Sequence, residues 1–197
     1  MIIIKGRRIC LREVSSADLP ILYKWRNDPR FICFCSTRRN QVSFEEFKEE
    51  LSKDFRRDRY LQCIILRSKK AIGTIYAYGV NRTDGYAFIT VYVISDHERR
   101  GCGVEAFALF LLYLFQELSL YKVYVEVYSY NKHSLSCLKN AGFVEEGRFR
   151  GHRLYNKERH DLVRLAFFRD ELPRLEKAEI NLIALISKFR EVRMSHQ

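Results

Sequence analysis

The stretch ISDHERRGCGVEAFALFLLYLF, residues 94–115, places two arginines and two glycines between a strand-like segment and a long apolar run. A turn between a strand and a helix presents unpaired backbone N–H groups at the positive end of the helix dipole, which suits phosphate. Gly101 and Gly103 let a ligand approach the main chain closely, and Arg99 and Arg100 can add charge-assisted hydrogen bonds. The spacing matches neither the P-loop nor the dinucleotide fingerprint, so the turn alone fits a plain tight turn equally well.

The segments on both sides of this turn predict an α/β (α+β) domain. Upstream, alternation and helical spacing predict a strand at 2–11, helices within 15–28 and 43–55, and strands near 60–67, 71–80 and 86–94. Downstream, they predict a strand from residue 121, a short helix within 131–143, and strands near 143–155 and 159–169. We expect one twisted, mixed, mostly antiparallel sheet with helices on both faces. The first helix should end at Pro29.

The strand before the turn and the strand after its helix should be parallel neighbours, because a strand, a helix and a second strand follow in order. A ligand site is then expected at the carboxyl ends of these two strands, where the glycine turn lies. The NRTDG segment, residues 81–85, predicts an antiparallel hairpin between the two preceding strands.

Composition indicates a folded, soluble domain, since 47% of the 197 residues are hydrophobic. The longest apolar run, residues 106–115, is far shorter than the roughly 20 residues of a membrane-spanning helix. Six cysteines show neither CxxC pairs nor zinc-finger spacing, so we expect free thiols, no metal and a cytoplasmic location. Cys33 and Cys35 as metal ligands are the alternative.

The net charge of +11 indicates an affinity for anions without naming one. The basic residues are spread along the chain, which argues against a dedicated nucleic-acid module. We expect no direct contact with nucleic acid and no membrane partner.

Two landmarks in order resemble the GCN5-related N-acetyltransferase (GNAT) superfamily. They are the arginine–glycine turn and the helix that begins NKHS and runs into NAGF and EEGR, residues 131–148. The resemblance lies in the branch that includes ribosomal-protein N-terminal and spermidine N-acetyltransferases, and it covers residues 1–172. It implies a GNAT domain at 1–172 and leaves a C-terminal helical extension at 173–197. That extension has the apolar stripe of an amphipathic helix, which either docks on its own domain or forms a homodimer.

The resemblance implies direct transfer of an acetyl group from acetyl-CoA, as co-substrate, to a primary amine in a ternary complex without metal. By position, it implicates Val93 and Ile94 in binding pantetheine and Asn131 in contacting the cofactor. The pyrophosphate would lie on Arg99, Arg100, Gly101, Cys102, Gly103 and Val104. The family's turn pattern fails at one position in either register, at Glu98 or at Glu105, so we assign the pyrophosphate to the main chain.

The chemistry requires a base, because an amine attacks a thioester only as the free amine, and an acid for the leaving thiolate. Glu126 is a candidate base, but it can equally pair with an arginine across the sheet; a water relay or a residue of the first helices is the alternative. Leu138 stands where many relatives carry the acidic tyrosine. The acid is therefore left open between Tyr128, Tyr130, Cys137 and water.

The resemblance places the acceptor near Trp25, Arg26 and Tyr155, although each also has a purely structural reading in the core, in an ion pair or in a hairpin. The resemblance implies that the acceptor is a small-molecule amine or the N-terminus of a protein such as a ribosomal protein, which would bring the chain near nucleic acid only indirectly. The rival reading is a non-catalytic acyl-CoA-binding or RNA-binding module on the same fold, because fold alone does not fix function.

Overall fold

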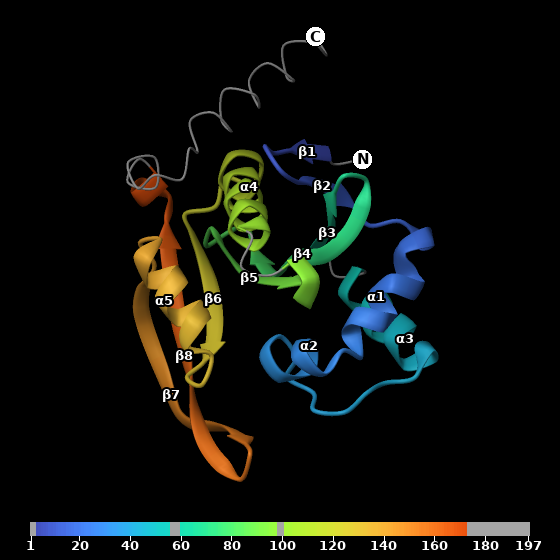
Figure 1. Ribbon diagram of the computed structural model, residues 1–197. Coiled ribbons are helices and arrows are strands. Elements are labelled where there is room, and N and C mark those ends of the chain that lie inside the picture. Colours follow the sequence, from blue (N-terminus) through green and yellow to red (C-terminus); the bar gives the residue numbers. More distant parts are fainter. Residues whose placement is uncertain (1–2, 56–59, 98–100, 173–197) are drawn as a thin grey trace.

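The computed structural model describes residues 3–55, 60–97 and 101–172 of the chain. These ranges form one mixed sheet with helices on both faces (Figure 1). The strands are β1 (Ile3–Lys5), β2 (Cys10–Glu13), β3 (Leu61–Arg67), β4 (Lys70–Asn81), β5 (Tyr86–Val93), β6 (Lys122–Tyr128), β7 (Val144–Tyr155) and β8 (Glu158–Phe168). The helices are α1 (Leu19–Arg26), α2 (Pro29–Phe34), α3 (Phe44–Phe55), α4 (Cys102–Glu117) and α5 (Lys132–Asn140).

The sheet has the order β1-β2-β3-β4-β5-β6-β8-β7, and its pairs are antiparallel except for β5 with β6. This confirms both the mostly antiparallel sheet and the parallel neighbours on either side of the glycine turn. The parallel pairing is short, and its last pair joins Phe88 to Tyr124. Because β5 continues to Val93 and β6 to Tyr128, the two strands diverge toward their carboxyl ends. We call this opening the β5–β6 splay.

Helix α4 lies on one face of the sheet and is apolar on most of its surface. Ten of its residues are buried, among them Leu109, Phe110 and Leu111. A helix that is apolar nearly all round belongs inside a protein, and α4 packs with the sheet and with Phe143 and Phe167 in the larger core. The glycine turn is therefore fixed to the most deeply buried helix of the domain.

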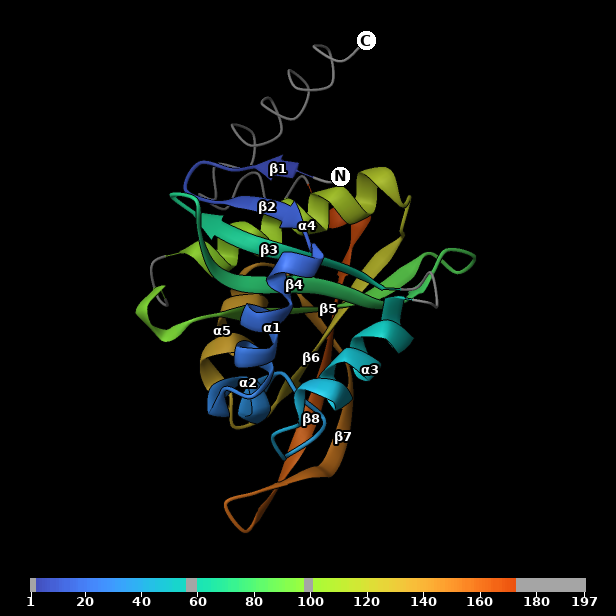
Figure 2. The ribbon, with the colours of Figure 1, turned by 90° about the vertical axis from the view of Figure 1, so that its right-hand side faces the viewer.

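Helices α1, α2 and α3 cover the opposite face (Figure 2). Leu22 and Trp25 of α1, Phe31 of α2 and Phe47 of α3 form a second core with Tyr92 of β5. Helix α3 begins with a capping box, in which the Glu46 N–H donates to Ser43 Oγ at 3.2 Å and the Ser43 N–H donates to Glu46 Oε2 at 2.7 Å.

The single strand predicted at 2–11 is wrong, because the structure has two short antiparallel strands there. The chain reverses at Gly6, whose N–H donates to the Ile9 carbonyl at 2.8 Å. A Cβ on Gly6 would collide with Glu105 and with Leu109, so the glycine lets α4 pack against the reversal.

Helix α2 was also missed. Pro29 follows the end of α1, as predicted, but it occupies the first turn of a new helix, where a missing N–H costs nothing. Asp28 caps this helix by accepting the N–H groups of Arg30 and Phe31.

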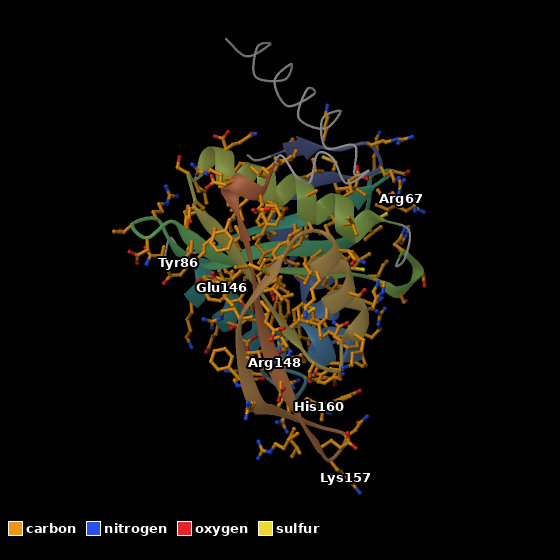
Figure 3. All side chains as sticks on the ribbon, turned by 90° about the vertical axis from the view of Figure 1, so that its left-hand side faces the viewer. Arg67, Tyr86, Glu146, Arg148, Lys157 and His160 are labelled. Atoms are coloured by element: carbon orange, nitrogen blue, oxygen red, sulfur yellow. The ribbon has the colours of Figure 1, made fainter. Side chains whose placement is uncertain are left out.

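The β7–β8 hairpin extends past the rest of the sheet and ends in a tight turn at Asn156 and Lys157 (Figure 3). None of the helices in the described ranges combines the length and apolar character needed to cross a bilayer. The predicted helical extension at 173–197 lies outside the described residues, and so does any interface that it would form. The domain boundary at residue 172 therefore stays a prediction.

Candidate active site

The turn before α4 has the backbone geometry of an anion site. Gly101 precedes the helix with φ of 75°, in the left-handed region, and among the described residues no side chain caps the helix there. The first helical hydrogen bond runs from the Glu105 N–H to the Gly101 carbonyl at 3.0 Å. The N–H groups of Cys102, Gly103 and Val104 therefore have no partner within the helix and stand at its positive end. Arg99 and Arg100, the other two turn residues assigned to pyrophosphate, lie outside the described residues.

Glu105, the acid that breaks the family pattern, contacts the reversal between β1 and β2. Its side chain is buried, and Oε1 accepts the Arg8 N–H at 2.8 Å. The same contact brings Arg8 to the turn, where its Nη1 lies 2.7 Å from the position that a Cβ on Gly101 would take. Sequence reasoning missed Arg8, because nothing local in the sequence links the β1–β2 reversal to α4. The first turn of α4 thus combines open N–H groups, a glycine where a Cβ would crowd Arg8, and a nearby cation, which fits a diphosphate.

The β5–β6 splay continues from this turn along the edge of β5. Ile94 was predicted to bind pantetheine through its backbone, but its N–H donates to the Ile72 carbonyl at 2.9 Å and its carbonyl accepts the His97 N–H at 3.1 Å. The Ile94 N–H is therefore engaged within the sheet, and its carbonyl already accepts one hydrogen bond. Successive N–H groups of a strand point to opposite edges. Val93 therefore directs its own N–H and carbonyl toward the splay, as a backbone site for pantetheine requires.

A cavity of about 460 Å³ lies on the other side of β5, between the sheet and helices α1 to α3. Its lining includes Trp25, Arg26, Glu50, Tyr76, Tyr78 and Thr90. Two of the three predicted acceptor residues, Trp25 and Arg26, are among the lining residues. The third, Tyr155, is not among them, and its ring stacks on Tyr130 with centroids 4.6 Å apart. Because Thr90 belongs to β5, the cavity and the splay share one strand.

The charged wall of the cavity is an ion-pair network from α1, α3 and the loop between α2 and α3. Arg26 Nε lies 3.2 Å from Glu50 Oε2, and Arg38 Nη1 lies 2.8 Å from Glu50 Oε1. One carboxylate therefore serves two guanidinium groups. The sequence predicted that Arg26 could pair with an acid, but it did not identify Glu50 as that acid.

Glu126, the candidate base, is paired with an arginine. Arg164, its cross-strand partner on β8, places Nη2 at 2.6 Å and Nε at 3.1 Å from Glu126 Oε1. This is the alternative that the sequence left open, and it argues against Glu126 as a free base. The charge of Glu126 still affects Tyr78, a residue that lines the cavity. Burial first, and then the charge of Glu126, raise the pKa of Tyr78 to about 12.

The two tyrosines among the candidate acids differ in how their hydroxyl protons are used. Tyr130 donates to the Cys33 carbonyl of α2 at 2.6 Å, so its proton is already engaged. Tyr128 instead accepts from Arg153 Nη1 at 3.2 Å, which leaves its own proton for another partner. Burial raises the pKa of Tyr128, with Arg153 opposing that shift, so the hydroxyl stays protonated at neutral pH.

Arg153 is a second residue that the sequence did not reveal. It is 5% exposed and donates to the carbonyls of Ile32, Ser36 and Thr37 at and beyond the end of α2. Its guanidinium also lies over the Tyr128 ring, 4.7 Å from the centroid. One buried cation therefore ties the position of Tyr128 to the helices that cover the cavity.

Asn131 caps α5, because its Oδ1 accepts the Ser134 N–H at 3.2 Å. Only its amide NH₂ group is then left to contact a cofactor. Cys137 is exposed, with its sulfur 3.7 Å from His133 Nε2, while Leu138 packs against the larger core. Within the described ranges, no three His, Cys, Asp or Glu side chains gather as ligands of a metal ion would.

The sequence profile of the acetyltransferase (GNAT) domain family matches residues 8–144. The chain belongs to this family; it is an acyltransferase that uses acetyl-CoA as co-substrate to acetylate an amine. This favours the enzyme over the non-catalytic binding module.

Two Bacillus subtilis relatives have comparable identity to this chain. The prophage-derived N-acetyltransferase YokL is 24% identical over 74% of this chain and 81% of its own length. YdaF, provisionally named a ribosomal N-acetyltransferase, is 25% identical over 67% of this chain and 74% of its own length.

Solved structures show the same fold. Spermidine N-acetyltransferase from Vibrio cholerae, in complex with CoA and spermine, superposes with a TM-score of 0.78 at 21% identity. The match covers 84% of this chain and 98% of that one. A dodecameric structure of the Vibrio cholerae enzyme gives a TM-score of 0.75 at 22% identity, covering 86% and 99%.

Proposed function

We propose that the protein transfers the acetyl group to a primary amine held in the cavity beneath α1, α2 and α3. The observation that carries this proposal is the shared strand. β5 lines the splay with the Val93 backbone and the cavity with the Thr90 side chain, so a donor on one side can meet an acceptor on the other.

The donor is held by main-chain groups in this proposal. The N–H groups of Cys102, Gly103 and Val104, with Arg8 beside them, bind the diphosphate, and Val93 binds the pantetheine arm. Acetyl-CoA supplies an acetyl group that is activated as a thioester. The Asn131 amide is a further contact at the start of α5.

Proton transfer is assigned to two different routes. Tyr128 donates its hydroxyl proton to the departing sulfur, because Arg153 orients the hydroxyl without using that proton. The acceptor ammonium loses its proton to water in the open cavity, since Arg164 holds the carboxylate of Glu126. Tyr130 keeps a structural role through Cys33.

The acceptor class is a primary amine, on a small molecule or at the N-terminus of a protein. Related proteins are named for both, a ribosomal N-acetyltransferase and spermidine N-acetyltransferases. Free cysteines in the described ranges support a cytoplasmic location. A homodimer through residues 173–197 remains part of the proposal.

Release of CoA thiol from acetyl-CoA, measured with and without amines, tests this function. The panel contains polyamines, amino sugars, amino acids and short peptides, and the amine-free reaction is the control for hydrolysis. We expect at least one amine to raise thiol release well above hydrolysis. If every amine fails and the protein instead binds RNA with a steep dependence on salt, it is a binding module and not an enzyme.

A further inference from the structure

Arg26 has a buried hydrogen-bond donor without a partner. The residue is 9% exposed and lines the cavity, and its Nη1 has no hydrogen-bond partner in the described part of the chain. Buried donors are nearly always satisfied, so an unsatisfied one in the wall of a binding cavity indicates an acceptor group that arrives with a ligand.

The other buried polar side chains of the cavity do not share this feature. Gln62 Nε2 donates to Thr74 Oγ1 at 2.9 Å, and Thr74 Oγ1 donates to the Cys63 carbonyl at 3.0 Å. The Tyr60 hydroxyl donates to Gln62 Oε1 at 3.2 Å. These groups bond to one another within the sheet. Three buried nitrogens in the described residues have no partner, namely Arg26 Nη1, Arg153 Nε and Arg169 Nε, and of these only Arg26 Nη1 belongs to a residue that lines the cavity.

The charged residues of the cavity also favour an oxyanion as the ligand. The cavity lining holds three cations, Arg26, Arg38 and Lys53, and the carboxylate of Glu50. Lys53 is paired with Glu49, which lies outside the lining, at 3.7 Å, so two guanidinium groups share one carboxylate. Both oxygens of Glu50 are already used by Arg26 and Arg38. A polycation would meet net repulsion in this cavity, whereas an oxyanion would be attracted.

We propose that the acceptor is an amine that also carries an oxyanion, a carboxylate or phosphate, and that Arg26 binds this group. The inference rests on the proposed function and names its substrate class. A guanidinium group offers N–H donors in a planar fork that matches either oxyanion. Arg26 then selects against diamines, although the fold is shared with enzymes named for spermidine.

Three amines with the same five-carbon chain test the charge preference. They are 5-aminopentanoate, pentylamine and 1,5-diaminopentane, and their affinities are measured by calorimetry with the protein alone and by CoA release in the full reaction. We expect 5-aminopentanoate to bind at least about tenfold more tightly than pentylamine, and the diamine to bind most weakly. A parallel titration with 3-aminopropyl phosphate decides which of the two oxyanions is preferred.

Substitutions test whether Arg26 causes the preference for 5-aminopentanoate. Arg26→Met should remove the tenfold preference, and Arg26→Lys should remove most of it while it keeps a cation beside Glu50. Glu50→Gln should strengthen binding of 5-aminopentanoate several-fold, because it removes the competing carboxylate. Lys48→Gln, which removes a cation on the same helix α3 outside the cavity lining, should leave the preference unchanged.

Equal affinities for the three amines, or a preference for the diamine, would overturn this inference and leave acetyl transfer standing. A preference that survives in both Arg26 variants would overturn it as well. Tight binding of 5-aminopentanoate without CoA release from any amine would have the opposite meaning. It would support the oxyanion site and count against the proposed function.

Discussion

Gly101 and Gly103 stand two residues apart in the turn before α4, yet only one of them depends on being glycine for the fold. Gly101 has φ of 75°, and an added Cβ would lie 2.7 Å from Arg8 Nη1. Gly103 is within the helix, and its Cβ would make an ordinary 3.5 Å contact with Val93 Cγ2. Gly101 is therefore required by the backbone conformation, whereas Gly103 only leaves space in the turn.

We predict opposite effects of alanine at these two glycines. Gly101→Ala should lower the free energy of unfolding by about 1–2 kcal/mol, because an L-residue is strained in the left-handed region. Gly103→Ala should leave it unchanged or raise it by up to about 1 kcal/mol, because alanine favours a helix. Urea denaturation of both variants measures the difference, and equal losses would contradict the assigned backbone roles.

Tyr128 and Tyr130 form a second matched pair at this scale. Tyr128→Phe should lower kcat by about 100-fold or more with little change in KM for acetyl-CoA, because it removes a proton donor. Tyr130→Phe should lower stability by about 1 kcal/mol, since it loses the bond to Cys33, and should keep kcat within a few-fold. Steady-state kinetics of both variants measure this, and the reverse pattern would exchange the two roles.

Local sequence predicts some site residues and not others for a physical reason. Gly101 lies in a turn that the neighbouring residues of the chain predict, and Asn131 stands at a helix start that resembles the family's, so both could be placed from the sequence. Arg153 is different, because its partners Ser36 and Thr37 lie more than a hundred positions away. Long-range contacts of this kind have no signal in a single sequence.

At the scale of elements, an ion pair ties β2 to the start of α1. Arg12 donates to both carboxylate oxygens of Asp18, at 2.7 and 2.9 Å, and Ser15 adds hydrogen bonds from its N–H and hydroxyl. The Arg12 hydrogen bond is the largest cause that lowers the pKa of Asp18 from its ordinary 3.8 to about 2. This tether sets where α1 begins, and α1 carries Trp25 and Arg26 into the cavity.

The tether predicts a specific loss of stability in acid. The pKa of Asp18 is lower in the folded protein than in the unfolded chain, so its stabilisation is complete above about pH 4 and is lost as pH falls toward 2. Asp18→Asn should therefore cost about 1–2 kcal/mol at pH 7 and almost nothing at pH 2. Urea denaturation of both proteins across this range measures the difference, and a gap that stays constant with pH would contradict the account.

The elements could be predicted where they are long and periodic. Helices α3 and α4 and strands β3 to β6 were placed by alternation, helical spacing and caps. Helix α2 has only six residues, and its Pro29 is also a common helix terminator, so the sequence pattern favoured a loop. The reversal at Gly6 was hidden in an apolar segment, and its cause, the contact with Glu105 and Leu109, is a feature of the tertiary structure.

At the scale of the whole molecule, strand β5 contributes to both the β5–β6 splay and the cavity beneath helices α1 to α3. The order of a strand, a helix and a strand predicted that β5 and β6 are parallel, because crossovers follow that rule. It could not predict where their pairing stops, since this depends on how β4 and β8 pair on either side. The same holds for the cavity, which exists only once α1, α2 and α3 fold over the opposite face.

Thermal unfolding with and without acetyl-CoA tests the central claim, that the turn before α4 and the β5–β6 splay hold the donor, without any assumption about the acceptor. Acetyl-CoA at a hundredfold over its Kd should add about 2.7 kcal/mol, which for a domain of this size raises Tm by roughly 5–11 °C. Gly103→Trp, which fills the turn, should fold and lose that shift. An unchanged Tm of the wild-type protein at saturating acetyl-CoA, or a full shift in Gly103→Trp, would contradict the account.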